Sequence, residues 1–192
     1  MRVTAVLFWL GLVLWFAAAV LPGAAAISAF TVLPRMGATS AEAQAFFGAD
    51  TKGSAQYLAG HVLQPLFTAT DWVQISAGAL CVSMVLRLWR LGGMPGPRMV
   101  RVATVLLVVG AGALLAVRLA QANPMMADLA TYWAAIPAMD HAAADAAKQS
   151  FDAAHHTAER LSSAQVTALL AAVIAAAIAT TSRPANADPH AI

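Results

Sequence analysis

Charged residues are scarce in this chain. Only 10% of its 192 residues are Asp, Glu, Lys or Arg, and 60% are hydrophobic, whereas soluble domains average roughly 25% charged residues. This composition excludes an ordinary soluble domain. Long apolar stretches occur at about residues 3–33, 65–88, 102–120 and 163–181, and crossing a bilayer takes about 20 apolar residues. We therefore expect one integral membrane domain over residues 1–192, with no separate soluble domain.

Cysteine is nearly absent as well, because Cys81 is the only one. It cannot form an intrachain disulfide, and its place in the inner half of the second span is typical of a small packing residue. The sequence contains no phosphate-binding loop, no paired catalytic carboxylates and no nucleophile–base–acid set. Ser162 and Ser163 beside Glu159 are typical of helix packing. The sequence predicts a protein that is not an enzyme.

The apolar stretches do not alternate with polar residues, as the strands of a membrane β-barrel would. The fold class predicted is therefore all-α, an integral membrane four-helix bundle. The first span begins almost at Met1 and is interrupted by Pro22 and Gly23. A cleaved signal peptide is an alternative interpretation, since small residues follow at Ala24 to Ala26, but the length of the apolar run favours a kinked, retained helix. Pro65 is expected in the first turn of the second span.

The charges are distributed unequally between the two ends of the spans. The turn at 89–101 and its flanks are rich in arginine: Arg87, Arg90, Arg98 and Arg101. Short loops rich in Lys and Arg stay in the cytoplasm, so this turn and both termini are predicted to be cytoplasmic in the cell inner (plasma) membrane. Residues 34–64 and 121–162 are predicted to be extracytoplasmic. The net charge of +2 indicates orientation and not nucleic-acid binding, and the basic turn indicates a contact with lipid headgroups.

Both extracytoplasmic connections are long enough to contain short amphipathic helices. In the first, Thr39 and Glu42 have the spacing of a capping box, and Gly48 is suited to end the helix. In the second, Asn123 and Pro124 are expected to end the third span. An interfacial helix with Tyr132 and Trp133 is then expected over Met125 to Ile136, with Pro137 starting another segment.

The last helix is predicted to be long. Residues 139–181 contain no Pro or Gly and are rich in Ala, a composition that favours one continuous helix of about 60 Å. Its first half is therefore expected to project out of the membrane before its second half crosses.

A structural polar cluster is predicted in the outer half of the bundle. Asp71 lies within the second span, and an acid inside a membrane needs a partner. Arg118 lies at a similar depth near the end of the antiparallel third span, and His155 is predicted to form hydrogen bonds between packed helices nearby. We interpret Asp71 and Arg118 as an ion pair that locks two helices. A proton or ion relay and snorkelling of both groups to the interface are the alternatives.

The long last helix also carries weak candidates for a metal site. Carboxylate and imidazole groups at i,i+4 spacing suit zinc or copper, and the candidates are His155, His156, Asp152 and Glu159. Adjacent histidines point in different directions on a helix, which argues against a site, and no metal is expected. Haem would need facing histidines at membrane depth. None of the five histidines lies within a span core, so no cofactor is expected.

The first and last spans carry a family resemblance. The segment FWLGLVLWFAAAVLPGAAAISAFTVLP, with Phe30, Leu33 and Pro34, resembles the first helix of the transmembrane protein 205-like family, also known as domain of unknown function 4149. Phe151 and His155 ahead of the Val166 to Ile178 run are similar to the start of that family's last helix. The Asn that usually follows the His is absent, with Ser162 the nearest substitute. The resemblance implies a four-helix membrane protein without an established activity.

These observations leave three hypotheses about function. The first is a non-enzymatic membrane protein that packs with itself or with another membrane protein, its partners being the lipid bilayer and a possible homo-oligomer. The second is a small transporter or metal-handling protein resembling the copper-resistance D type. The third is a membrane-embedded redox or hydrolytic enzyme. Small residues in the third and fourth spans would permit close helix packing in a bundle or in a dimer.

Overall fold

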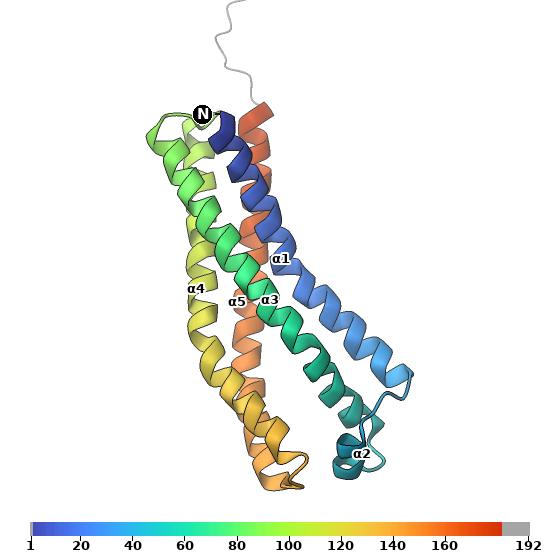
Figure 1. Cartoon of the computed structure of the whole chain (residues 1–192). Helices are drawn as coiled ribbons and strands as arrows, with labels where there is room; N and C mark the ends of the chain where they lie inside the picture. Colours follow the sequence, from blue (N-terminus) through green and yellow to red (C-terminus); the bar gives the residue numbers. More distant parts are fainter. Residues whose placement is uncertain (1, 182–192) are drawn as a thin grey trace, which may run out of the picture.

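The computed structural model describes residues 2–181, and all its regular elements are helices. They are α1 (Arg2–Arg35), α2 (Ala41–Phe47), α3 (Thr51–Arg90), α4 (Arg98–Ala135) and α5 (His141–Thr181) (Figure 1). All but α2 are long and apolar enough to cross a membrane. The predicted all-α, four-helix architecture is confirmed, and the chain is a multi-pass membrane protein.

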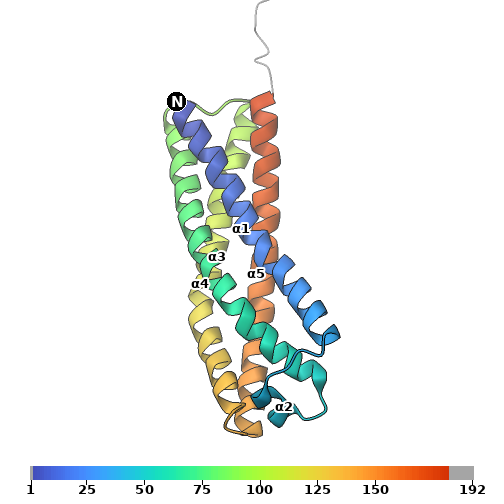
Figure 2. The same ribbon diagram turned by 45° about the vertical axis from the view of Figure 1, so that its right-hand side comes forward.

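The four long helices form two pairs. α1 packs extensively against α3, and α4 packs extensively against α5, whereas α3 touches α4 and α1 touches α5 over much smaller areas. α3 and α5 therefore face each other across the diagonal of the bundle. In both views the α1–α3 pair inclines away from the α4–α5 pair toward the end that carries α2 (Figures 1 and 2). The two pairs are joined mainly in the half of the bundle that contains the N-terminus.

Prolines lie inside α1, α3 and α4 without ending these helices. Pro22 is interior to α1, so the predicted interruption at Pro22 and Gly23 does not break that helix. α3 begins at Thr51, where the Asp50 carboxylate accepts hydrogen bonds from the N–H groups of Lys52 and Gly53, and not at Pro65 as expected. An interior proline removes one backbone hydrogen bond and costs about 3 kcal/mol. Burial of residues on the first turns of α3, including Tyr57 and Leu63, offsets this cost.

The helix break expected at Asn123 and Pro124 is also absent. α4 continues to Ala135, so the predicted interfacial helix is the last part of α4. This extension packs along the first part of α5, where Ser150 donates a hydrogen bond of 2.7 Å to Asp128. The predicted long last helix is confirmed as α5, with 41 residues. Helices α4 and α5 thus form a hairpin that extends about 20 residues beyond a 30 Å hydrocarbon core.

The short helix α2 begins one residue later than the capping-box pattern predicts. The Ser40 hydroxyl accepts the hydrogen bond from the Ala43 N–H at 3.2 Å, so Ser40 and not Thr39 is the N-cap. Glu42 instead accepts a hydrogen bond of 3.4 Å from the Tyr57 hydroxyl on α3. Gly48 follows the helix with a φ of 58°, as the sequence predicts. This interaction with Tyr57 contributes to holding α2 against α3.

The main core fills the half of the bundle that contains the N-terminus. Trp15 of α1 is fully buried at its centre. Its indole ring lies against Gly78 of α3, where a Cβ atom would come within 3.1 Å of the ring. Cys81 is buried in the same cluster, in agreement with a packing role. Around them lie side chains from all four long helices, namely Phe8, Leu12, Val85, Leu88, Val108, Ala111, Leu115, Leu169 and Ala172.

The turn between α3 and α4 provides a stability test with a matched control. Gly92 and Gly96 both have positive φ, 63° and 86°, and a left-handed conformation costs other residues about 1–2 kcal/mol. Only Gly96 is also crowded, because an added Cβ would lie 2.8 Å from the Ala179 Cα, whereas Gly92 has open space. We expect Gly96→Ala to lower the free energy of unfolding by at least about 1 kcal/mol more than Gly92→Ala. Equal losses in SDS unfolding of the purified protein would contradict the contact with α5.

Candidate functional site

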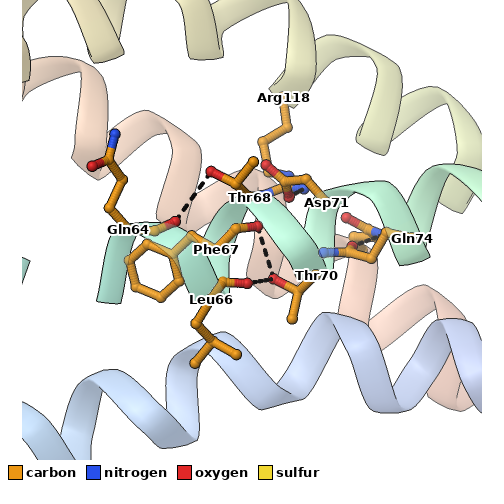
Figure 3. A network of polar contacts seen from close by, with 9 residues as sticks. Gln64, Leu66, Phe67, Thr68, Thr70, Asp71, Gln74 and Arg118 are labelled. Carbon is orange, nitrogen blue, oxygen red and sulfur yellow. Dashed lines mark hydrogen bonds and ion pairs between the residues drawn. The ribbon is translucent and has the colours of Figure 1, made fainter. Parts of the chain in front are cut away.

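Asp71 on α3 and Arg118 on α4 form an ion pair between the two helix pairs. The Arg118 Nη2 atom lies 2.5 Å from the Asp71 Oδ1 atom. The Arg118 side chain is 18% exposed and the Asp71 side chain is 29% exposed. The close-up shows both side chains pointing toward each other from adjacent helices (Figure 3). The partnership proposed from the sequence is therefore present. Each charge is neutralised inside a region where an unpaired charge would be costly.

A second polar contact lies about one turn further along α3. Gln165 on α5 donates a hydrogen bond of 3.0 Å from its Nε2 atom to the Gln74 Oε1 atom. Gln74 and Gln165 are 2% and 1% exposed, so this is the most deeply buried side-chain pair among residues 2–181. Because α3 and α5 are diagonal, the bond crosses the centre of the bundle. We call Asp71, Arg118, Gln74 and Gln165 the polar layer.

The polar layer is satisfied mostly by its own members. Thr70, which is buried next to it, donates its hydroxyl hydrogen to carbonyl oxygens of its own helix, those of Leu66 and Phe67 (Figure 3). Two nearby donors are not satisfied in this way. The Arg118 Nε and the Trp15 Nε1 atoms are buried and have no hydrogen-bond partner among residues 2–181. The layer therefore combines two completed contacts with donors that have no hydrogen-bond partner among residues 2–181.

His155 makes its contacts on its own helix. Its Nε2 atom lies 3.3 Å from the Glu159 Oε1 atom, and its ring stacks on Phe151 with a centroid distance of 5.2 Å. It precedes Gln165 by ten residues, about 15 Å along α5. The residue that α5 contributes to the polar layer is thus Gln165, and the predicted cluster membership of His155 stays a prediction.

The weak metal candidates are arranged as ion pairs along α5. Glu159 contacts both neighbouring histidines, since the His156 Nδ1 atom lies 3.2 Å from the Glu159 Oε2 atom. Asp152 is paired with Lys148 one turn earlier. Within residues 2–181, no three His, Cys, Asp or Glu side chains are grouped so that they could hold a metal ion.

The far end of the bundle is joined by aromatic and histidine side chains. Phe46 of α2 stacks on His141 of α5 at a centroid distance of 4.2 Å. His61 of α3 lies 4.1 Å from the Trp133 ring of α4, and Tyr57 and Ile136 are buried beside them. We call this set the outer cluster. It connects the two helix pairs at the end where they diverge.

Gln74 and Gln165 are the members of the polar layer that the sequence did not identify, and Gln165 is the one that α5 contributes. The signal available was a single amide inside an apolar, Ala-rich run. That signal identifies a buried polar residue but gives no partner, because the partner lies on a helix that is not its neighbour.

Comparisons with protein-family models, with curated proteins and with solved structures find no match to this chain. The class of protein is therefore defined by the fold alone, as a multi-pass α-helical membrane protein with a polar layer between two helix pairs. The resemblance to the transmembrane protein 205-like family stays a prediction.

Proposed function

We propose that this chain is a non-enzymatic membrane protein that binds a protein partner through the extension formed by α4 and α5 outside the membrane. The observation that carries this proposal is the mutual pairing in the polar layer. Polar side chains that hold one another across helices stabilise a fixed arrangement, and α3 is held in this way to both α4 and α5. The layer fixes the hairpin relative to the rest of the bundle, as a rigid binding surface requires.

The extension supplies a suitable surface for a partner. It is helical on both sides of the turn, and its two helices are joined by the hydrogen bond between Ser150 and Asp128. Residues 121–162 contain five acidic and two basic residues, which favours a partner surface with basic groups. A different membrane protein with basic groups at this level fits that charge, whereas a second copy of the chain would place two acidic extensions together.

Site-specific photo-crosslinking in cells tests this proposal. A photoreactive amino acid at Gln149, exposed on the extension, is expected to give a discrete crosslinked product. The matched control is Leu106, which is 66% exposed but lies on the lipid-facing surface of α4. A product at twice the mass of the chain would identify a second copy, and any other mass a different protein. Absence of a product at Gln149 and at neighbouring exposed positions would contradict the proposal.

We further propose that the chain resides in the inner (plasma) membrane with the 89–101 turn in the cytoplasm. The N-terminus, this turn and the end of α5 lie at one end of the bundle (Figure 1), and this end carries Arg2, Arg87, Arg90, Arg98 and Arg101. A periplasmic reporter enzyme, alkaline phosphatase, fused after residue 140 is expected to be active, and the same enzyme fused after residue 93 inactive. A fluorescent protein that folds only in the cytoplasm should give the reverse pattern. Activity of alkaline phosphatase at residue 93 alone would reverse the orientation.

A second candidate function is that of a small transporter or metal-handling protein. Two observations favour it. The polar layer lies between helix pairs that contact each other much less than they contact their own members, and the Arg118 Nε donor has no partner in the part of the chain that the structure describes. Rocking of one pair against the other around a polar site is a common basis of alternating access. The glutamine variants described in the Discussion distinguish this function from the first.

A further inference from the structure

A shallow depression, open to the surroundings, lies on the surface of α3 near its C-terminal end. Its lining residues are Ser83, Leu86, Arg87, Arg90 and Leu91. They are spaced i, i+3, i+4, i+7 and i+8, which places them on one face of the helix. We call this feature the basic hollow. It combines two guanidinium groups and a hydroxyl group with two leucine side chains.

Within residues 2–181, the arginines of the basic hollow have no acidic partner. In the part of the chain that the structure describes, the ion pairs involve only Asp71, Asp152 and Glu159 as acids. All three acids belong to the other half of the bundle. Arg2 and Arg98 add positive charge at the same end as the hollow. Any acidic group that pairs with Arg87 or Arg90 therefore lies outside residues 2–181.

The hollow lies at the level of the lipid headgroups. Arg87 and Arg90 occupy the last turn of α3, where the apolar span ends, and long basic side chains at this position extend their charged ends to the interface. Leu86 and Leu91 are 39% and 55% exposed, so apolar surface borders the charged groups. Trp89 is also exposed, which is typical of the interface. This arrangement matches the chemistry of a phospholipid, an anionic group attached to a hydrocarbon chain.

We propose that the basic hollow is a binding site for an anionic phospholipid. The phosphodiester accepts hydrogen bonds from the Arg87 and Arg90 guanidinium groups, whose planar geometry suits phosphate oxygens. The Ser83 hydroxyl adds a third donor, and an acyl chain lies along Leu86. This inference is independent of the proposed partner binding and of the orientation of the chain, because it requires only that this end of the bundle reach a leaflet that contains anionic lipid.

The test compares two double variants of the purified full-length chain in a zwitterionic detergent. Arg87→Gln/Arg90→Gln removes two charges from the hollow. Arg2→Gln/Arg98→Gln removes two exposed charges from the same end of the bundle but outside the hollow. Native mass spectrometry measures the affinity for phosphatidylglycerol, with phosphatidylcholine as the neutral lipid. Circular dichroism and thermal unfolding without added lipid confirm that both variants are folded.

We expect the hollow variant to bind phosphatidylglycerol on the order of tenfold to thirtyfold more weakly than the natural chain. The affinity of the control variant for phosphatidylglycerol should fall less than threefold, and phosphatidylcholine should bind weakly to all three proteins. Equal losses in the two variants would overturn the proposal, because they would indicate diffuse attraction to the whole basic end. Full displacement of the lipid by inorganic phosphate at millimolar concentration would also overturn it, since the hollow would then be a site for a free anion.

Discussion

Replacing Asp71 with leucine is expected to lower the free energy of unfolding by about 2–3 kcal/mol. The change leaves the Arg118 guanidinium without its counter-charge at 18% exposure. Breaking a fully buried pair costs about 3–5 kcal/mol, and the remaining exposure of both side chains lowers this figure. Unfolding in SDS of the detergent-solubilised protein measures the loss.

Two comparison variants are needed to interpret the stability lost by Asp71→Leu. Asp152→Asn removes the exposed ion pair with Lys148, and exposed pairs contribute less than about 1 kcal/mol, so this variant should remain close to the natural chain. Asp71→Arg combined with Arg118→Asp restores opposite charges and is expected to recover at least half of the stability lost in either single charge change. If Asp71→Leu costs no more than Asp152→Asn, both charges reach solvent and the pair does not hold α3 to α4.

Replacing Gln165 with methionine is expected to cost about 1–3 kcal/mol, because the buried Gln74 amide then lacks its partner. Methionine keeps a similar length and flexibility, so the loss reports the amide and not a cavity. The double variant Gln74→Met/Gln165→Met removes both amides together. It is expected to be within about 1 kcal/mol of the natural chain, because no unsatisfied amide remains. Unfolding curves of the two single variants and the double variant form a mutant cycle.

The double methionine variant also separates the two candidate functions. If the polar layer only fixes the arrangement of helices, the folded double variant should keep the crosslink formed at Gln149. If the layer contacts a transported solute, the double variant should fold and keep that crosslink but lose any phenotype that deletion of the natural chain produces. Loss of the crosslink from a stable double variant would contradict the expectation that the Asp71–Arg118 ion pair, which this variant keeps, is enough to position the extension.

Helix content and the number of spans were predictable because they depend on composition along short windows. The partnership of Asp71 and Arg118 was also predictable. Asp71 precedes the start of the turn at Leu91 by 20 residues, and Arg118 follows the start of α4 at Arg98 by 20 residues, so antiparallel helices place them at one level. A short turn therefore fixes a pairing that the sequence alone can identify.

The positions of the helix ends and the hydrogen bond between Gln74 and Gln165 could not be predicted from composition or from the length of a turn. Local sequence preferences place helix ends at Pro65 and Pro124. Both prolines instead lie inside helices, because the packing of the helical residues beyond each proline outweighs one lost backbone hydrogen bond. The pairing of Gln74 with Gln165 depends on the position of α5 relative to α3, and these helices are joined through α4 and two turns. No local pattern in the sequence contains that relative position.

The grouping of helices into two pairs has a consequence for biogenesis. α1, α2 and α3 leave the ribosome before the turn at 91–97, and they contain one complete pair. The α4–α5 hairpin follows, with its own extensive interface already present within a contiguous segment. Each half can therefore compact as it enters the bilayer, and the ion pair and the amide bond between the halves form last. A chain severed within that turn keeps both internal interfaces, so co-expressed halves should reassemble through the same contacts that join them in the intact protein.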